Sequence, residues 1–171
     1  MTEQNTAAIA TQSPDLSAQM KEGMRRLASG VSVVSAAHEG IRYAMTASSV
    51  TSVSDSPASL LVCVNKQARF SKPMHSGQYF GVSLLSAAQQ DISNTCAMPN
   101  DEEVRFATGN WIQDDRTGLY YLQDAQAAFV CKKVQHIEHG THDIFIGNIE
   151  QIHINSDDIN PLIYLNGGYL G

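Results

Sequence analysis

The sequence has little of several features that would assign a protein to a class at once. Only three cysteines occur among its 171 residues; they lie more than thirty positions apart and form no C-x-x-C pair, so neither a disulfide framework nor a zinc knuckle is expected. It contains no run of about eighteen apolar residues, and its first fifteen residues lack the basic start and apolar middle of a secretory signal. We therefore expect a cytoplasmic protein with reduced cysteines and no membrane segment.

Basic residues are also scarce. Eleven Lys and Arg stand against 17 Asp and Glu, for a net charge of -6, which argues against a nucleic-acid partner. The G-x-G-x-x-G turn of doubly wound nucleotide-binding folds, the Walker pattern and the G-x-S-x-G elbow of hydrolases are all missing. Dinucleotide-binding domains and nucleophile-based hydrolases are therefore disfavoured.

The chain has the length of one domain, which we place at 13–171 after a disordered tail at 1–12. Ser13-Pro14-Asp15 is a helix start, and apolar residues at helical spacing predict an amphipathic helix of about four turns that ends at Gly30 and packs on a neighbour. Downstream, a hairpin around 38–40, a strand at 59–65 buried on both faces, a strand at 79–85, a helix from Ser86 to about Cys96 and several later strands are expected. Seven or eight strands with two or three helices favour an antiparallel barrel or sandwich, mainly β, with peripheral helices.

Hydroxyl side chains crowd one segment. The stretch AMTASSVTSVSDSP at 44–57 holds seven Ser and Thr between two strand-like segments. Each hydroxyl must face water, bond the backbone or face a ligand, and the segment alone leaves these three options open.

A local reversal of charge follows the buried strand. Lys66, Arg69 and Lys72 fall within seven positions of an acidic chain, which suits either a small phosphorylated ligand or a solvated helix face. Because the strand 41–47 is expected near the strand 59–65, the hydroxyl segment and this cluster would line one pocket.

Three histidines surround a turn. His136, His139 and His142 are spaced by three, but residues three apart on a hairpin point to opposite faces, so a polar hairpin end is favoured over a metal site. His142 opens an apolar strand, where it could serve a pocket as a proton or hydrogen-bond partner.

Six segments carry a pattern that extends over nearly the whole chain: RRLASGVSVVSA (25–36), AMTASSVTSVSDSPASLLVCVNK (44–66), FGVSLLSAAQQ (80–90), EVRF (103–106), AAFVCKKVQHIEHGTHDIFIGNIEQI (127–152) and PLIYLNGGY (161–169). Its most specific part is T-A-S-S-x-x-S-x-S-x-x-P followed by a V-C-V-N strand end. In their order these segments resemble the short flavin reductases, the reductase components of two-component flavin monooxygenases, and the likeness spans about residues 16 to 170.

The resemblance implies an antiparallel Greek-key split β-barrel, the FMN-binding split barrel, that forms a homodimer with flavin near the interface. It implies that one segment edges the isoalloxazine ring, that a second runs along the ribityl chain and phosphate, and that a strand flanks the same cofactor. The cofactor-binding residues so implied are Met45, Thr46, Ala47, Ser48, Ser49, Val50 and Ser52, then Cys63, Val64, Asn65, Lys66, Arg69 and Ser71, then Phe80, Gly81, Val82, Ser83 and finally Tyr169.

His142 matches the histidine of the family's G-D-H turn near the nicotinamide, and is the implied catalytic residue. The chain departs from the pattern at Thr141, where the family usually has Asp, and at Thr95-Cys96, where a Phe-Ala pair is usual. The first departure affects the nicotinamide contact and the second the wall of the pocket.

The implied function is an NAD(P)H:flavin oxidoreductase that reduces FMN or FAD by hydride transfer and supplies reduced flavin to a separate monooxygenase. Two alternatives stay open: a flavin-binding split barrel without catalysis, and an oxidase of the pyridoxamine-phosphate oxidase type, which would need more basic residues around its substrate. The flavin, FMN or FAD, and the hydride donor, NADH or NADPH, are not distinguished by these residues.

Overall fold

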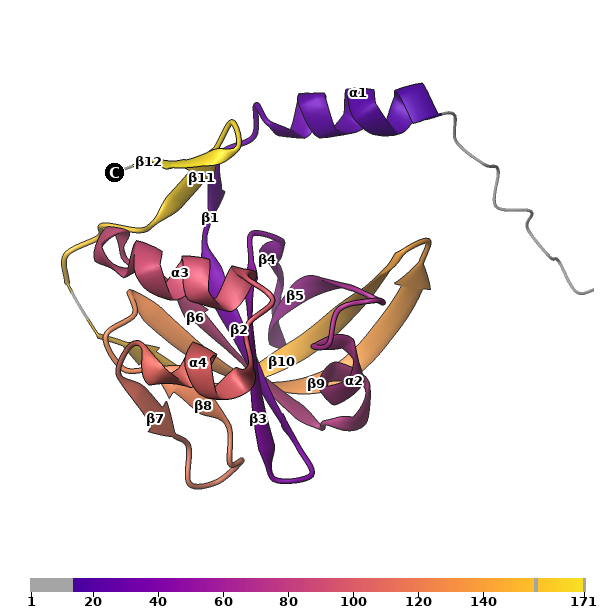
Figure 1. Cartoon of the computed structure of the whole chain (residues 1–171). Helices are drawn as coiled ribbons and strands as arrows, with labels where there is room; N and C mark the ends of the chain where they lie inside the picture. Colours follow the sequence, from indigo (N-terminus) through magenta and orange to yellow (C-terminus); the bar gives the residue numbers. More distant parts are fainter. Residues whose placement is uncertain (1–13, 156, 171) are drawn as a thin grey trace, which may run out of the picture.

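A computed structural model describes residues 14–155 and 157–170, shown in Figure 1. The expected tail at 1–12 and the capping residue Ser13 lie outside the described residues. The part of the chain that is described contains no helix long and apolar enough to cross a membrane.

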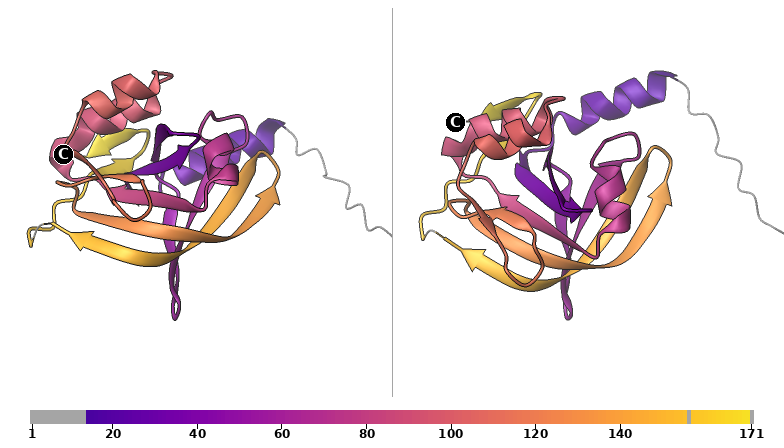
Figure 2. Two further views of the ribbon diagram at one scale, coloured as in Figure 1. Left: turned by 90° about the horizontal axis from the view of Figure 1, so that it is seen from below. Right: turned by 60° about the horizontal axis from the view of Figure 1, so that its bottom comes forward.

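One seven-stranded antiparallel sheet dominates the structure, as the mainly β prediction requires. Its order is β3-β2-β6-β9-β10-β5-β4, and the long strands β9 and β10 curve around one side of the molecule (Figure 2). The strands are β2 (Ser32–His38), β3 (Ile41–Ala47), β4 (Val50–Asp55), β5 (Ala58–Asn65), β6 (Tyr79–Leu84), β9 (Ala127–His139) and β10 (His142–Ile154).

The two edges of this sheet are consecutive in sequence. β3 and β4 stand at opposite ends of the strand order, and only Ser48 and Ser49 separate them along the chain. The curved sheet therefore returns to itself at this connection without pairing its edges, which makes a split barrel. The hydroxyl-rich segment lies at the split, and a strand edge left unpaired there has backbone groups available for other partners.

The predicted β2–β3 hairpin is confirmed. Its turn uses Glu39 at φ 52° and Gly40 at φ 76°, the left-handed backbone that two-residue hairpin turns need. From this turn the register runs from His38 opposite Ile41 to Ser32 opposite Ala47, which fixes the direction of every side chain along β3.

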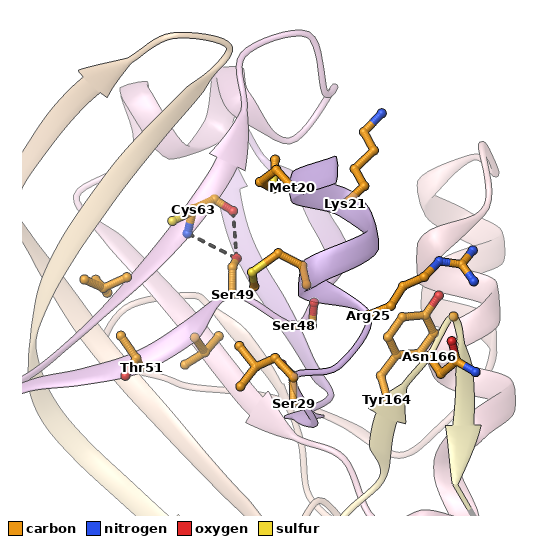
Figure 3. A pocket seen from close by; sticks show the side chains of 15 residues that line it. Met20, Lys21, Arg25, Ser29, Ser48, Ser49, Thr51, Cys63, Tyr164 and Asn166 are labelled. Atoms are coloured by element: carbon orange, nitrogen blue, oxygen red, sulfur yellow. Dashed lines mark hydrogen bonds between the residues drawn. The ribbon is translucent and has the colours of Figure 1, made fainter. Parts of the chain in front are cut away.

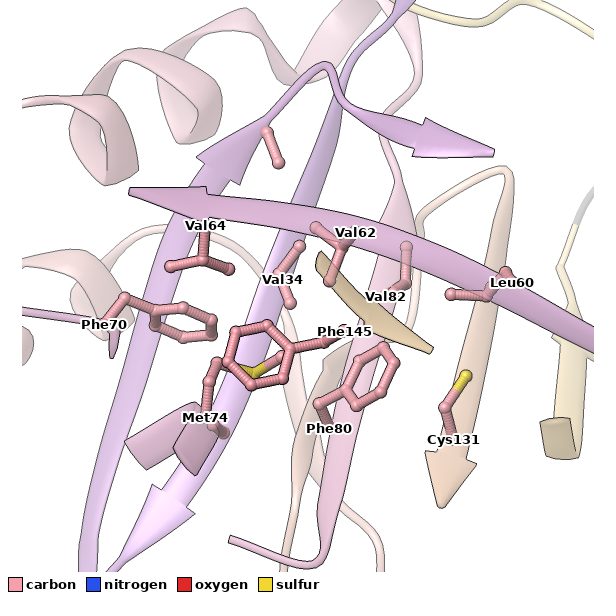
Figure 4. Close-up of a cluster of buried hydrophobic side chains, with 12 residues drawn as sticks. Val34, Leu60, Val62, Val64, Phe70, Met74, Phe80, Val82, Cys131 and Phe145 are labelled. Atoms are coloured by element: carbon pink, nitrogen blue, oxygen red, sulfur yellow. The ribbon is translucent and has the colours of Figure 1, made fainter. Parts of the chain in front are cut away.

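The barrel interior is filled by aliphatic and aromatic side chains, drawn in Figure 4. Phe80 and Phe145 are buried from β6 and β10, and Phe70 and Met74 enter from the segment of α2 (Ser71–Ser76). Gly147 on β10 is required here, because a Cβ at this position would stand 2.6 Å from the Phe80 ring. The interior is packed with protein, so any ligand must bind outside it.

A second apolar cluster fixes the helices to the outer face of β2 and β3. Its members include Val33, Ala44, Ile92, Phe106 and Leu122. The helices are α3 (Gln90–Ala97) and α4 (Glu102–Ala107), followed by the hairpin β7 (Trp111–Gln113) and β8 (Tyr120–Leu122). The predicted capping box is present: Ser86 and Gln89 bond reciprocally at the turn η1 (Ala87–Gln89) that leads into α3.

The first helix is shorter than the prediction. After α1 (Pro14–Met24), the Arg25 amide still bonds the carbonyl of Lys21, four residues back, but the amides of Arg26 and Leu27 bond carbonyls only three residues back. The helix therefore ends there, and Ser29–Gly30 forms β1 instead. β1 pairs with β11 (Ile163–Leu165), which pairs with β12 (Gly168–Leu170). The apolar side of α1, expected to pack on a neighbour, is more than half exposed at Leu16, Met20, Met24 and Leu27.

One helix was not predicted, and one further prediction was wrong in part. The unpredicted helix is α4, which begins within the polar stretch MPNDEE; its first turn holds Glu102 and Glu103, acidic residues that suit the positive end of a helix. β5 is buried on one face only: Leu60, Val62 and Val64 are in the core, whereas Leu61 and Cys63 are half-buried on the other face. In total the described residues form twelve strands and four α-helices, more than expected, because short strands such as β1 and β7 have no clear pattern.

Candidate functional site

Two hydroxyls at the split, on Thr46 near the end of β3 and on Ser49 in the β3–β4 connection, are hydrogen-bonded to neighbouring backbone. The Thr46 hydroxyl donates to the carbonyl of Ser93 on α3 at 2.6 Å. The Ser49 hydroxyl donates to the Cys63 carbonyl at 3.1 Å and accepts from the Cys63 amide at 3.3 Å, so it joins the loop to β5. These bonds fasten the end of β3 to α3 and the connection between β3 and β4 to β5.

Ser48 and Thr51 are exposed, and among the described residues neither side chain has a hydrogen-bond partner. Both lie on a pocket of about 690 Å³, which we call the ring pocket and show in Figure 3. It is lined by Met20, Lys21, Met24, Arg25 and Leu27 of α1 and its continuation, Ser29, Ser48, Ser49, Val50 and Thr51 of the split, Leu61 and Cys63 of β5, and Tyr164, Asn166 and Gly167.

The walls of the ring pocket are mostly apolar. Met20, Met24 and Leu27 contribute one side, and the half-buried face of β5 contributes Leu61 and Cys63. Partial burial raises the pKa of the Cys63 thiol, so it is an uncharged wall group at neutral pH. An apolar pocket with a few hydroxyls at one edge suits a flat ring with polar atoms on one side.

A smaller pocket of about 440 Å³, which we call the aromatic pocket, shares Ser48 and Tyr164 with the ring pocket. Met45, Thr46 and Tyr169 also line it. The Tyr169 and Tyr164 rings meet edge to face, and the Tyr169 hydroxyl is 2.7 Å from the Ser93 hydroxyl. Through Ser93, α3 is therefore joined both to β12 and to the end of β3. The position of Ser93 in the sequence did not indicate this role.

Arg105, which the sequence analysis did not single out, is buried behind the aromatic pocket. Its guanidinium donates to the carbonyls of Ala44, Cys96, Met98 and Asn100, the last three at 2.8 to 3.2 Å. Glu102 lies close by and accepts the Ala44 amide at 3.1 Å; burial raises the pKa of its carboxyl. One cation thus binds the end of α3 and the start of α4 to β3, just before Met45.

The predicted basic cluster forms a third pocket, the basic pocket, of about 460 Å³. It lies at the end of β5, three residues beyond Cys63, and on β3 two residues before Met45. It is lined by Tyr43, Lys66, Ala68, Arg69, Ser71 and Lys72. The structure therefore gathers all three cations, and it places them along the same two strands that line the other two pockets.

The cations of the basic pocket have acidic neighbours. Lys66 Nζ is 2.8 Å from Glu138 and 3.8 Å from the buried Asp143, and the hydrogen bond with Glu138 raises the pKa of Lys66. Asp143 accepts a hydrogen bond of 2.8 Å from His75 Nε2 of α2. Below them, Lys133 donates to the carbonyls of Met74 and His75, which fixes the end of α2 against β9.

Several residues implied by the resemblance lie away from these pockets. Ala47, Val64, Phe80 and Val82 are core residues, Gly81 and Ser83 are buried on β6, and the Ser83 hydroxyl accepts the Leu122 amide at 3.1 Å. Ser52 is exposed on β4, and Asn65 is exposed at the end of β5, each outside the pockets found. Their part in cofactor binding stays a prediction.

His142 is exposed at the β9–β10 turn. Its Nδ1 is 2.9 Å from the Thr141 hydroxyl. In the strand register, His142 lies opposite Asn65 of β5 on one side and opposite His139 of β9 on the other. It lines none of the pockets found among the described residues. His136 instead faces His75, with ring centroids 5.0 Å apart. No group of three or more His, Cys, Asp or Glu that could hold a metal was found in the described ranges.

The cysteines are free, as predicted. Cys96 and Cys131 are buried, and desolvation raises the pKa of each thiol to about 12. The site therefore presents no thiolate.

The residues present fit a phosphorylated flavin. An apolar pocket edged by unpartnered hydroxyls would take the ring, and three converging cations would take the phosphate. The loop between β3 and β4, Ser48 and Ser49, forms part of the wall of the ring pocket.

Comparison with known proteins agrees with this geometry. The family model for the flavin reductase like domain matches residues 24–171. The reductase component of an FADH(2)-dependent resorcinol hydroxylase from Rhizobium sp. (strain MTP-10005) is 35% identical over 85% of this chain and 82% of that protein. The FMN reductase (NADH) RutF of Ancylobacter novellus is 38% identical over 74% of this chain and 69% of that protein.

Among solved structures, the Streptomyces globisporus C-1027 NADH:FAD oxidoreductase SgcE6, in complex with NAD and FAD fragments, superposes with a TM-score of 0.85 at 26% identity. The match covers 92% of this chain and 93% of that one. The split-barrel fold inferred from the resemblance is therefore confirmed, and the chain belongs to the flavin reductase-like family.

Proposed function

We propose that this protein is an NAD(P)H:flavin oxidoreductase that reduces FMN or FAD and supplies the reduced flavin to a separate monooxygenase. The observation that carries the proposal is that the ring pocket lies along β5, at Leu61 and Cys63, while the basic pocket lies at the end of the same strand, at Lys66. Relatives named as a hydroxylase reductase component and as an NADH-dependent FMN reductase support it.

Each part of the chain then has a binding task. Ser48 offers a hydroxyl to the polar edge of the ring, while Leu61, Cys63 and Met24 exclude water from its apolar edge. Lys66, Arg69 and Lys72 attract the phosphate. When bound, the flavin supplies the hydride-accepting ring, and the protein supplies orientation and polarity.

Reduced nicotinamide is proposed to stack on the open face of the flavin, since the sequence contains no G-x-G-x-x-G turn that would hold the dinucleotide on its own. As the resemblance implies, His142 is proposed to lie near the nicotinamide and to act as the catalytic residue. Its place opposite Asn65, at the end of β5 next to the basic pocket, supports that role.

The experiment is direct. Purified protein is mixed with NADH or NADPH and excess FMN or FAD, and absorbance at the nicotinamide band is followed. Consumption that requires both flavin and protein supports a reductase. Flavin binding without consumption of either nicotinamide would indicate a passive flavin binder, and turnover of a phosphorylated pyridine ring with oxygen would indicate the oxidase alternative.

We also propose that the protein is a cytoplasmic homodimer. Three large apolar side chains on α1 and Leu27 just beyond it, each more than half exposed, form a surface that a second copy would cover. Light scattering after gel filtration tests this, with Met20→Glu as the variant expected to shift the mass from two chains to one. A wild-type mass of one chain would reject it.

A further inference from the structure

The basic pocket is close to electrically neutral in spite of its three cations. Lys66 bonds Glu138 at 2.8 Å and Arg69 lies 3.6 Å from Asp101, whereas Lys72 has no ion-pair partner among the described residues. Asp143 adds a third negative charge 3.8 Å from Lys66. Three carboxylates therefore face three ammonium or guanidinium groups before any phosphate arrives.

The carboxylates differ in how readily they can move. Asp143 is 1% exposed and held by His75, so its charge is fixed beneath the pocket, and its second oxygen has no hydrogen-bond partner in the described part of the chain. The side chains of Glu138 and Asp101 are 66% and 87% exposed, and each can turn into solvent. An arriving phosphate can displace these two and cannot displace Asp143.

We infer that Glu138 and Asp101 compete with the flavin phosphate for Lys66 and Arg69, and so set how easily the flavin is released. The inference rests on the proposed function, in which the phosphate binds in the basic pocket. A reductase that passes its reduced flavin to another protein needs an exchangeable flavin. A pocket whose cations are already paired gains less from the phosphate than an unpaired one would.

Glu138→Gln and Asp101→Asn test the inference, because each removes one charge and keeps the shape of the side chain. Exposed ion pairs are weak, so each change is expected to tighten FMN binding about two- to fivefold, and the double variant about four- to twentyfold. Riboflavin, which lacks the phosphate, should bind all variants equally. The rate of FMN dissociation should fall by the same factors, and added salt should reduce the differences.

The matched control is Glu103→Gln. Glu103 is 88% exposed and pairs with Arg42 at 3.6 Å, and neither residue lines the basic pocket. The substitution therefore changes the net charge of the protein by the same amount as Glu138→Gln does, without touching the cations of the basic pocket. It should leave FMN affinity unchanged. Equal tightening in Glu103→Gln and Glu138→Gln, or no tightening in the double variant, would overturn the inference.

The wild-type titration separates this result from a failure of the proposed function. If wild-type protein binds FMN and consumes NADH while the variants bind FMN no more tightly, only the inference fails. If wild-type protein binds neither FMN nor riboflavin, the proposed function fails with it.

Discussion

The ring pocket lies along β5 and the basic pocket lies at the end of the same strand, but the two pockets are built by different means. The ring pocket has uncharged walls, and its shape depends on hydrogen bonds within the protein, of Ser49 to β5 and of Thr46 to α3. The basic pocket is made of exposed, mobile charges around one buried carboxylate, Asp143. The ring pocket therefore supplies shape, and the basic pocket supplies an adjustable attraction for phosphate. Mutations in the two pockets should differ in the size of their effects and in whether those effects depend on the phosphate of the ligand.

The largest effect is expected on the stability of the fold, at Arg105, which is buried behind the aromatic pocket. Arg105→Met leaves the carbonyls of Ala44, Cys96 and Met98 without their buried donor, at a cost of at least about 3 kcal/mol in the free energy of unfolding. Urea denaturation followed by circular dichroism measures it. The control is Arg69→Met, because Arg69 is an exposed arginine of the basic pocket and should change stability little. Equal losses at both positions would contradict the comparison.

The next largest effect is expected on binding of the flavin ring. Ser48→Phe places an aromatic side chain where the ring and aromatic pockets meet, and should weaken FMN and riboflavin alike by at least about tenfold. Ser52→Phe, on the neighbouring strand but outside the pockets found, should bind both normally. Flavin fluorescence titration measures both variants. A loss at Ser52 as large as at Ser48 would place the ring along β4 instead.

A smaller, ligand-dependent effect is expected at Lys72. Lys72→Ala should weaken FMN about three- to tenfold and leave riboflavin unchanged, since only FMN carries the phosphate. Arg26→Ala serves as control, because Arg26 is an exposed cation paired with Glu22 on α1 at 2.9 Å. Parallel titrations of the two flavins give the ratio. A loss of riboflavin affinity in Lys72→Ala would mean that this residue shapes the pocket instead of holding phosphate.

The smallest effect concerns pH. Burial raises the pKa of Glu102 in the folded protein, so the folded state binds this proton more readily than the unfolded state does. The stability contributed by the protonated group is complete below the unfolded pKa of about 4.3 and is lost as pH rises through the higher folded pKa. Relative to Glu102→Gln, wild-type protein should therefore lose stability as the pH rises above about 4.3. Thermal melts over a series of pH values would show it, and a constant difference would contradict it.

Much of the fold follows from local pattern. Alternation and turn residues located the β2–β3 hairpin, the capping box at Ser86 located the start of the helical segment, and the charge reversal after Asn65 located the basic pocket. These signals are short-range, so a sequence carries them directly.

The remainder depends on contacts between distant segments. Arg105 and Ser93 look like ordinary surface residues of short helices, and only the packing of α3 and α4 on β3 makes them central to the site. The two hydroxyl roles were also inseparable by sequence: Ser49 is bonded to Cys63 while its neighbour Ser48 is not, and this difference arises from the geometry of the split. Phe80 to Ser83 were assigned to the cofactor through resemblance, yet their side chains are buried in the sheet.

The account depends on where a bound flavin lies, and a crystal structure with FMN would measure this most directly. We expect the ring to lie against Ser48 and Leu61 in the ring pocket, with the phosphate within hydrogen-bonding distance of at least two of Lys66, Arg69 and Lys72. A phosphate bound instead at Lys21 and Arg25, with Lys66 and Arg69 still paired to Glu138 and Asp101, would contradict it.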